Sequence, residues 1–228
     1  MLSIIDQVIS GNLYAFMMIF VRFGAAIFLL PGFGDNTVSP RVRLLLALMI
    51  SLLMTPVLAD RNPQHPVMVT ALLLLIVSET LIGVFFGTLM RLILAAVQVT
   101  GQIIALNTGL ANAFLFNPMF NSQSSLPAAL LSTAAVTVIF VTDLHHLMFM
   151  ALADTYNVFE PGGPIPVEDM ANVVSQKTME SFAIGTQLAA PFIIVTLLFF
   201  LAMGVLARIM PQMQIFYVAL PDRKSVEM

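Results

Sequence analysis

Residues 67–105 read VMVTALLLLIVSETLIGVFFGTLMRLILAAVQVTGQIIA, and this stretch decides the class of fold. Glu79 and Arg91 are its only charged residues. A helix that crosses a membrane needs about 20 mostly apolar residues, because each residue adds about 1.5 Å across about 30 Å of hydrocarbon. The stretch is too long for one crossing. We therefore expect one helix to about Arg91, continuing into a second helix that bends near Gly101.

Four further apolar stretches predict helices, at residues 13–30, 44–59, 126–150 and about 179–208. Turn-forming residues separate them, and residues 154–180 have the composition of a soluble segment. We therefore predict an all-α membrane protein of about five or six apolar helices, some of them kinked or paired as hairpins. Residues 1–221 would form one membrane domain, and residues 222–228 a polar tail.

The composition excludes several classes of protein. Of the 228 residues 59% are hydrophobic and 9% are charged, whereas a soluble domain carries about 25% charged residues. The absence of cysteine excludes disulfides and thiolate metal sites. A net charge of -3 without a basic run gives no sign of nucleic-acid binding. No nucleophile, zinc or phosphate-loop motif is present, so we predict no enzyme and no cofactor.

Arg22 and Glu79 lie inside apolar stretches, where a charge that faces lipid costs about 2.5–3.5 kcal/mol. Each side chain should therefore face protein or water. A proton or conduction pathway would explain the two charges. A structural ion pair or hydrogen bond between helices is the preferred interpretation, because transporters carry more such residues in register. Gly83 and Gly87 lie one and two turns after Glu79, a small-residue spacing that lets another helix approach closely.

His145 and His146 follow Asp143, a combination that raises the question of a metal site. Adjacent side chains on a continuous helix point about 100° apart, whereas metal-binding histidines are normally one turn apart. No second cluster of ligands occurs elsewhere in the sequence. We therefore predict no metal site and interpret the pair as solvated residues at the end of a helix.

An aromatic stretch between the third and fourth apolar regions has neither a helical nor an ordinary loop composition. Such backbone is tolerated at membrane depth only within protein or against a water-filled cavity. Residues 109–121 are therefore predicted to occlude a pore, although simple packing remains an alternative. The residues concerned are Gly109, Asn112, Phe114, Phe116, Asn117, Pro118 and Phe120.

Several short motifs occur in a fixed order over residues 10–221. They are Pro31-Gly32-Phe33-Gly34, Pro40 with Arg43, Glu79-x3-Gly83-x3-Gly87, Asn117-Pro118, His145-His146, Ala190-Pro191 and Arg208-x2-Pro211-Gln212-x3-Phe216. In this order they resemble the FliR family of flagellar export-gate proteins, called SctT in virulence injectisomes. The first and last motifs are the more specific ones, and each helix alone would be a weak signal.

The resemblance implies one subunit of a hetero-oligomeric helical assembly with FliP-like and FliQ-like subunits, which also engages a FlhB-like switch protein. Such an assembly passes unfolded flagellar proteins across the bacterial inner membrane at the flagellar basal body. The resemblance gives Phe114, Phe116 and Phe120 a gating role by position. It gives an assembly role to residues of the end motifs: Pro31, Phe33, Gly34, Pro191, Arg208, Pro211 and Gln212. It also implies that some apolar helices lie outside the bilayer among neighbouring subunits.

Three points stay open at this level. Family members continue past the position of Pro221 with a further apolar segment, which we expect to be missing here. The injectisome counterpart is an alternative to the flagellar gate. A small-solute transporter with Arg22, Glu79 and Asp143 as its coupling chain is a second alternative. Such transporters commonly have repeated halves, and this sequence has no such repeat.

Overall fold

The computed structural model describes residues 2–34, 38–59, 68–109 and 125–209, and all regular structure within these ranges is helical. The helices are α1 (Leu2–Ile27), α2 (Pro40–Leu58), α3 (Val69–Asn107), α4 (Leu126–Val141), α5 (Leu144–Val158) and α6 (Val167–Ile209). Three of them are long and apolar enough to cross a membrane, or four if α4 and α5 count as one bent span. The predicted all-α membrane class is confirmed.

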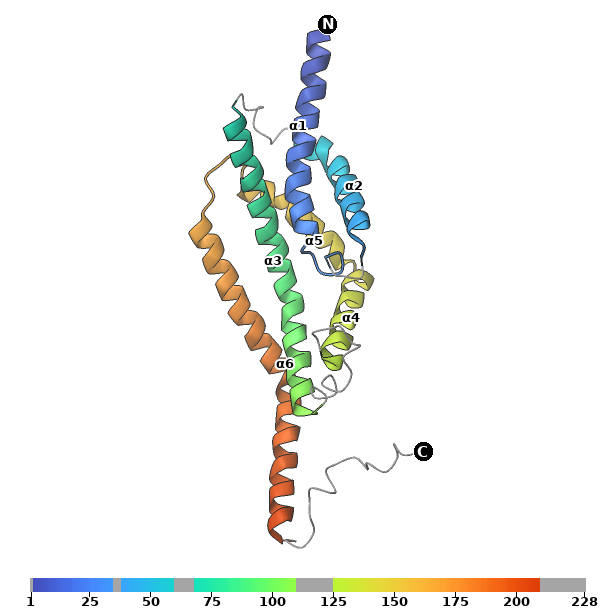
Figure 1. The fold of residues 1–228 in the computed structure, drawn as a ribbon, viewed down its shortest axis with the longest axis vertical. Helices are drawn as coiled ribbons and strands as arrows, with labels where there is room; N and C mark the ends of the chain where they lie inside the picture. The colour runs from blue at the N-terminus through green and yellow to red at the C-terminus, as the bar shows by residue number, and fades with distance from the viewer. Residues whose placement is uncertain (1, 35–37, 60–67, 110–124, 210–228) are drawn as a thin grey trace.

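Helix α3 is the central element of the fold, and α1, α4 and α6 pack along it (Figure 1). The predicted division of this stretch near Arg91 is wrong, because α3 is one helix of 39 residues. No proline interrupts α3, and its three glycines serve contact with neighbouring helices rather than bending. A Cβ at Gly101 would lie 2.8 Å from the Cβ of Ala128, so the missing side chain lets α4 approach α3.

The prediction of one helix over residues 126–150 is also wrong. Helix α4 ends at Val141 and α5 begins at Leu144, and the two helix axes differ in direction by 76°. Asp143 lies between them with φ of 57°, in the left-handed region. Aspartate is one of the few residues that enter this region at modest cost, so the break needs no glycine or proline.

The segment predicted to be soluble is shorter than residues 154–180. Helix α5 continues to Val158 and α6 begins at Val167, which leaves residues 159–166 as the connection. This connection reads FEPGGPIP, and its prolines and glycines explain why helix formation stops there. The polar residues that follow belong to the first turns of α6.

The core lies where α1 is enclosed by α2, α3 and α5. Its members are Ile19, Phe23, Ala26, Ile27, Leu30, Ala47, Leu58, Ile139, Met148, Leu152 and Tyr156. In contrast, the C-terminal part of α6 extends beyond the end of α3 (Figure 1). Most of its side chains are exposed. The described residues therefore form a compact part around α1 and an apolar helix end that no other described element covers.

Candidate functional site

The most distinctive site is a buried ion pair between Arg22 of α1 and Glu79 of α3. Both side chains are fully buried. The Arg22 Nε donates to Glu79 Oε2 at 2.5 Å, and Nη2 donates to Glu79 Oε1 at 2.9 Å. This two-pronged geometry gives strong charge-assisted hydrogen bonds and fixes the orientation of both groups.

The other contacts of Arg22 reach the C-terminal end of α5. Nη1 donates to Thr155 Oγ1 at 3.1 Å, and Nη2 donates to the Phe159 carbonyl at 3.2 Å. The guanidinium carbon lies 3.8 Å from the ring centroid of Tyr156, a cation–π contact. One side chain therefore joins α1, α3 and the end of α5. Sequence reasoning missed these α5 partners, because no local pattern marks them.

Gly83 and Gly87 explain how α1 comes close enough to place Arg22 beside Glu79. A Cβ at Gly83 would collide with the Arg22 carbonyl oxygen and would lie 2.9 Å from the Ala25 Cβ. A Cβ at Gly87 would lie 2.9 Å from the Ala26 carbonyl oxygen. The small-residue face of α3 thus receives the α1 backbone, as its spacing predicted.

Two other charged residues, Arg91 and Asp143, are not part of this cluster. Arg91 is exposed on α3, and Asp143 is exposed at the α4–α5 corner. A coupling chain of Arg22, Glu79 and Asp143 is therefore not assembled in this structure. The hydrogen-bonding groups of Arg22 and Glu79 are satisfied by each other and by the end of α5, an arrangement typical of a structural ion pair between helices.

Asp143, His145 and His146 lie close together at the start of α5. Each offers one ligand atom, and these atoms lie within 4.8 Å of one another. Asp143 Oδ1 and His146 Nδ1 are 3.6 Å apart, and both side chains are exposed. Both histidines belong to α5, whereas Asp143 lies at the break that precedes it, so the break determines where the carboxylate lies relative to the two rings. The absence of a metal site stays a prediction.

The first family motif forms the turn that follows α1. Pro31 is buried, and Gly32 has φ of 83°, which favours glycine. The ring of Phe33 lies 5.3 Å from that of Phe140 and 5.6 Å from that of Phe149. This turn therefore attaches the end of α1 to the α4–α5 corner.

Pro191 and Arg208 are exposed on α6, away from the buried pair. Helix α6 continues through Pro191 without a break. Gly109, with φ of 75°, follows the last turn of α3 and marks the start of the predicted gating segment. The other predicted gating and end-motif residues lie outside the described residues: Asn112, Phe114, Phe116, Asn117, Pro118, Phe120, Pro211 and Gln212.

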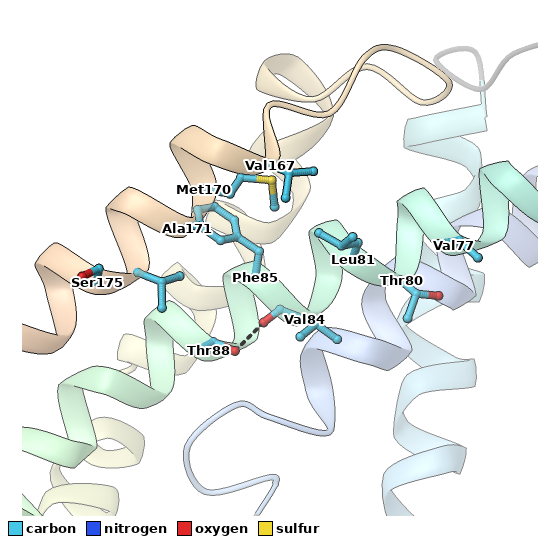
Figure 2. A pocket seen from close by; sticks show the side chains of 11 residues that line it. Val77, Thr80, Leu81, Val84, Phe85, Thr88, Val167, Met170, Ala171 and Ser175 are labelled. Carbon is cyan, nitrogen blue, oxygen red and sulfur yellow. Dashed lines mark hydrogen bonds between the residues drawn. The ribbon is translucent and has the colours of Figure 1, made fainter.

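A groove between α3 and α6 is a feature that sequence reasoning did not predict. Its volume is about 760 Å³. Figure 2 shows its lining, which we call the α3/α6 groove: Val77, Thr80, Leu81, Val84, Phe85 and Thr88 from α3, and Val167, Met170, Ala171, Val174 and Ser175 from α6. The spacing of three and four residues within each set was the signal available in the sequence.

Comparison with known proteins places this architecture in a family. A family model described as "Bacterial export proteins, family 1" matches residues 13–224. The flagellar biosynthetic protein FliR of Caulobacter vibrioides is 36% identical over 210 residues, which cover 92% of this chain and 84% of that protein. The FliR protein of Pectobacterium carotovorum is 31% identical, covering 91% of this chain and 78% of its own length. The FliR protein of Escherichia coli K12 is also 31% identical, with 92% and 79% covered. The chain therefore belongs to the bacterial export proteins of family 1, the FliR family that its motifs resemble.

Proposed function

We propose that this chain is one subunit of the flagellar type III protein-export gate in the bacterial inner membrane, at the flagellar basal body. It would line part of a pore for unfolded flagellar proteins together with FliP-like and FliQ-like subunits. A FlhB-like switch protein would also engage the assembly. The flagellar names of the relatives support this choice over an injectisome counterpart.

The observation that carries the proposal is the length and stagger of the apolar helices. The 39 residues of α3 span about 58 Å, whereas the hydrocarbon of a bilayer is about 30 Å thick. The most apolar windows of α2, α3 and α6 are only 17%, 17% and 6% buried within this chain. About half of the length of α3 lies outside any one layer of hydrocarbon, which supports a cover of protein rather than lipid over that part.

Two contacts fix the stagger between α3 and α6. Ser181 Oγ donates to the Leu92 carbonyl at 3.0 Å, and Thr100 Oγ1 donates to the Gly185 carbonyl at 3.0 Å. Helix α3 is apolar both before and after this crossing, whereas α6 is polar before it and apolar after it. The apolar part of α3 before the crossing and that of α6 after it do not fit within one slab of hydrocarbon, which supports a multi-subunit assembly.

The gating part of the proposal concerns residues 109–121. Its support is the aromatic composition of the stretch, the family resemblance and the anchoring of its flanks. Gly109 follows α3 directly, and Ser125 Oγ lies 3.5 Å from the Gly101 carbonyl, to which it donates. Phe114 and Phe116 are the residues that we expect to contribute most to occlusion.

The test of gating replaces Phe114 and Phe116 with Ala in the assembled complex. We expect increased leakage of ions or small solutes through reconstituted vesicles, with unchanged assembly. Phe199→Ala is the control, because Phe199 is an exposed aromatic residue in the C-terminal half of α6. Normal assembly with unchanged permeability would refute the gating assignment.

The test of membership is mass spectrometry of the complex extracted in mild detergent. FliP-like and FliQ-like chains should copurify with this chain. A folded, monomeric chain without companions would refute the export-gate proposal. Proton-coupled solute uptake by vesicles that contain this chain alone would instead favour the transporter, although the local satisfaction of Arg22 and Glu79 argues against it.

A further inference from the structure

We propose that the α3/α6 groove receives an apolar helix of a sister subunit, and that this helix presents one acidic residue to Arg91. The inference rests on the proposed function, because the export-gate assembly supplies the sister subunits. It goes further by naming the docking surface on this chain and the chemistry of the segment that occupies it.

The walls of the groove have the spacing of helix-packing faces. On α3, Val77, Leu81, Val84 and Thr88 recur every three or four residues. On α6, residues 167, 170, 171 and 174 do the same. Figure 2 shows Phe85 of α3 beside Met170 and Val167 of α6, where the two sets meet. Such paired stripes accept a third helix by interdigitation of side chains. The α3 stripe is about 16 Å long, or three helical turns.

The groove offers almost no polar group to a ligand. Thr80 Oγ1 donates to the Ile76 carbonyl and Thr88 Oγ1 donates to the Val84 carbonyl, each at 2.7 Å. These hydroxyls are thus engaged within α3, and their methyl groups add to the apolar wall. A segment that fills the groove must therefore be apolar where it touches it.

Protein fits this position better than lipid does, because α6 faces water at the level of the groove. Residues 167–180 of α6 include exposed polar side chains that acyl chains would not tolerate: Glu168, Asp169, Asn172, Gln176, Lys177 and Glu180. Lys177 Nζ and Glu180 Oε2 form an exposed ion pair at 2.6 Å. The hydrocarbon region of a bilayer does not extend to such a surface.

Arg91 supplies the charge that specifies the occupant. It lies seven residues after Val84 and three after Thr88, so it continues the α3 stripe beyond the groove. Its side chain is exposed, and it has no ion-pair or hydrogen-bond partner in the part of the chain that the structure describes. A docked helix would remove water from this guanidinium, which is favourable only if the helix brings an opposite charge.

The first experiment uses the absence of cysteine from the chain. Ser175→Cys is nearly isosteric and places a thiol in the groove, whereas Gln176→Cys places one about 100° around α6, outside the groove lining. Both positions are exposed in this chain. In the assembled complex, a water-soluble maleimide should label Ser175→Cys about tenfold more slowly than Gln176→Cys, a ratio that corresponds to about 1.4 kcal/mol.

Equal labelling of the two thiols in a complex that retains its FliP-like and FliQ-like subunits would overturn the docking inference and leave the proposed function intact. Failure of these subunits to copurify would refute the proposed function, and the inference with it. The two failures are therefore distinguishable in one preparation.

The second experiment identifies the occupant. A bifunctional cross-linker attached at Ser175→Cys should capture a sister-subunit peptide with an apolar helical stripe and a nearby Asp or Glu. Capture of a phospholipid or of a second copy of this chain would overturn the proposed occupant. Arg91→Gln should restore rapid labelling of the Ser175→Cys thiol, whereas Arg91→Lys should preserve protection. Unchanged protection in Arg91→Gln would overturn the role of Arg91.

Discussion

Replacement of Glu79 with Gln is expected to destabilise the subunit by about 3–5 kcal/mol, the usual cost of removing one partner from a buried ion pair. The guanidinium of Arg22 would remain fully buried with its charge uncompensated. Its other contacts are the Thr155 hydroxyl, the Phe159 carbonyl and the Tyr156 ring, which offer dipoles but no negative charge. The loss should loosen α1, α3 and the end of α5 together.

The thermal stability of the purified complex measures this effect, as the fraction that elutes intact from size exclusion after heating. Glu180→Gln is a matched control, because it makes the same chemical change in an exposed ion pair with Lys177. Exposed pairs contribute about 0.2–1 kcal/mol, so this variant should melt close to the unchanged protein. Equal melting of the Glu79 and Glu180 variants would refute the assigned importance of the buried pair.

A double variant separates pairing from simple loss of packing. Arg22→Met with Glu79→Gln removes both charges, so no charge remains buried without a partner. We expect the double variant to be more stable than Glu79→Gln alone, with a coupling energy of about 0.5–3 kcal/mol. Strictly additive effects of the two single variants would show that the two residues do not act as a pair.

Two further predictions concern the backbone. Gly83→Ala should lower the melting temperature, because the added methyl group would overpack against the Arg22 carbonyl and Ala25 at a cost of about 1–3 kcal/mol. Gly204→Ala is the control and should leave the melting temperature equal or higher, because a Cβ there meets nothing within 4 Å. Equal effects of the two changes would contradict the close approach of α1. Asp143→Val should destabilise the α4–α5 corner by about 1–2 kcal/mol, because a β-branched residue is strained at φ of 57°. Asp143→Gly should be tolerated. A stable Val variant in the same melting assay would contradict the left-handed conformation of residue 143.

The helical class could be read from the sequence because long apolar stretches with few charges admit no other fold in a membrane. That Arg22 and Glu79 face protein rather than lipid could also be predicted, because exposing a charge to lipid is costly. Their pairing joins residues 57 positions apart, and the contact with Thr155 spans 133 positions. Neither contact has a local signature, so only the tertiary structure identifies the partners.

The differences between the predicted and the observed structure have identifiable physical causes. The division of α3 assumed that each helix matches the thickness of a bilayer, and this helix does not. The break at Asp143 was missed because it uses neither glycine nor proline. The α3/α6 groove depends on how far two helices diverge, which spacing within each helix cannot give. Gating by Phe114 and Phe116 stays a prediction, because both residues lie outside the described residues.

The length of α3 has a consequence for biogenesis. A newly made copy that is not assembled with other subunits would expose an apolar surface longer than a membrane or a detergent micelle can cover. We expect such unassembled copies to be degraded by quality-control proteases. The cellular amount of this chain should therefore track the supply of its companions more closely than its own rate of translation.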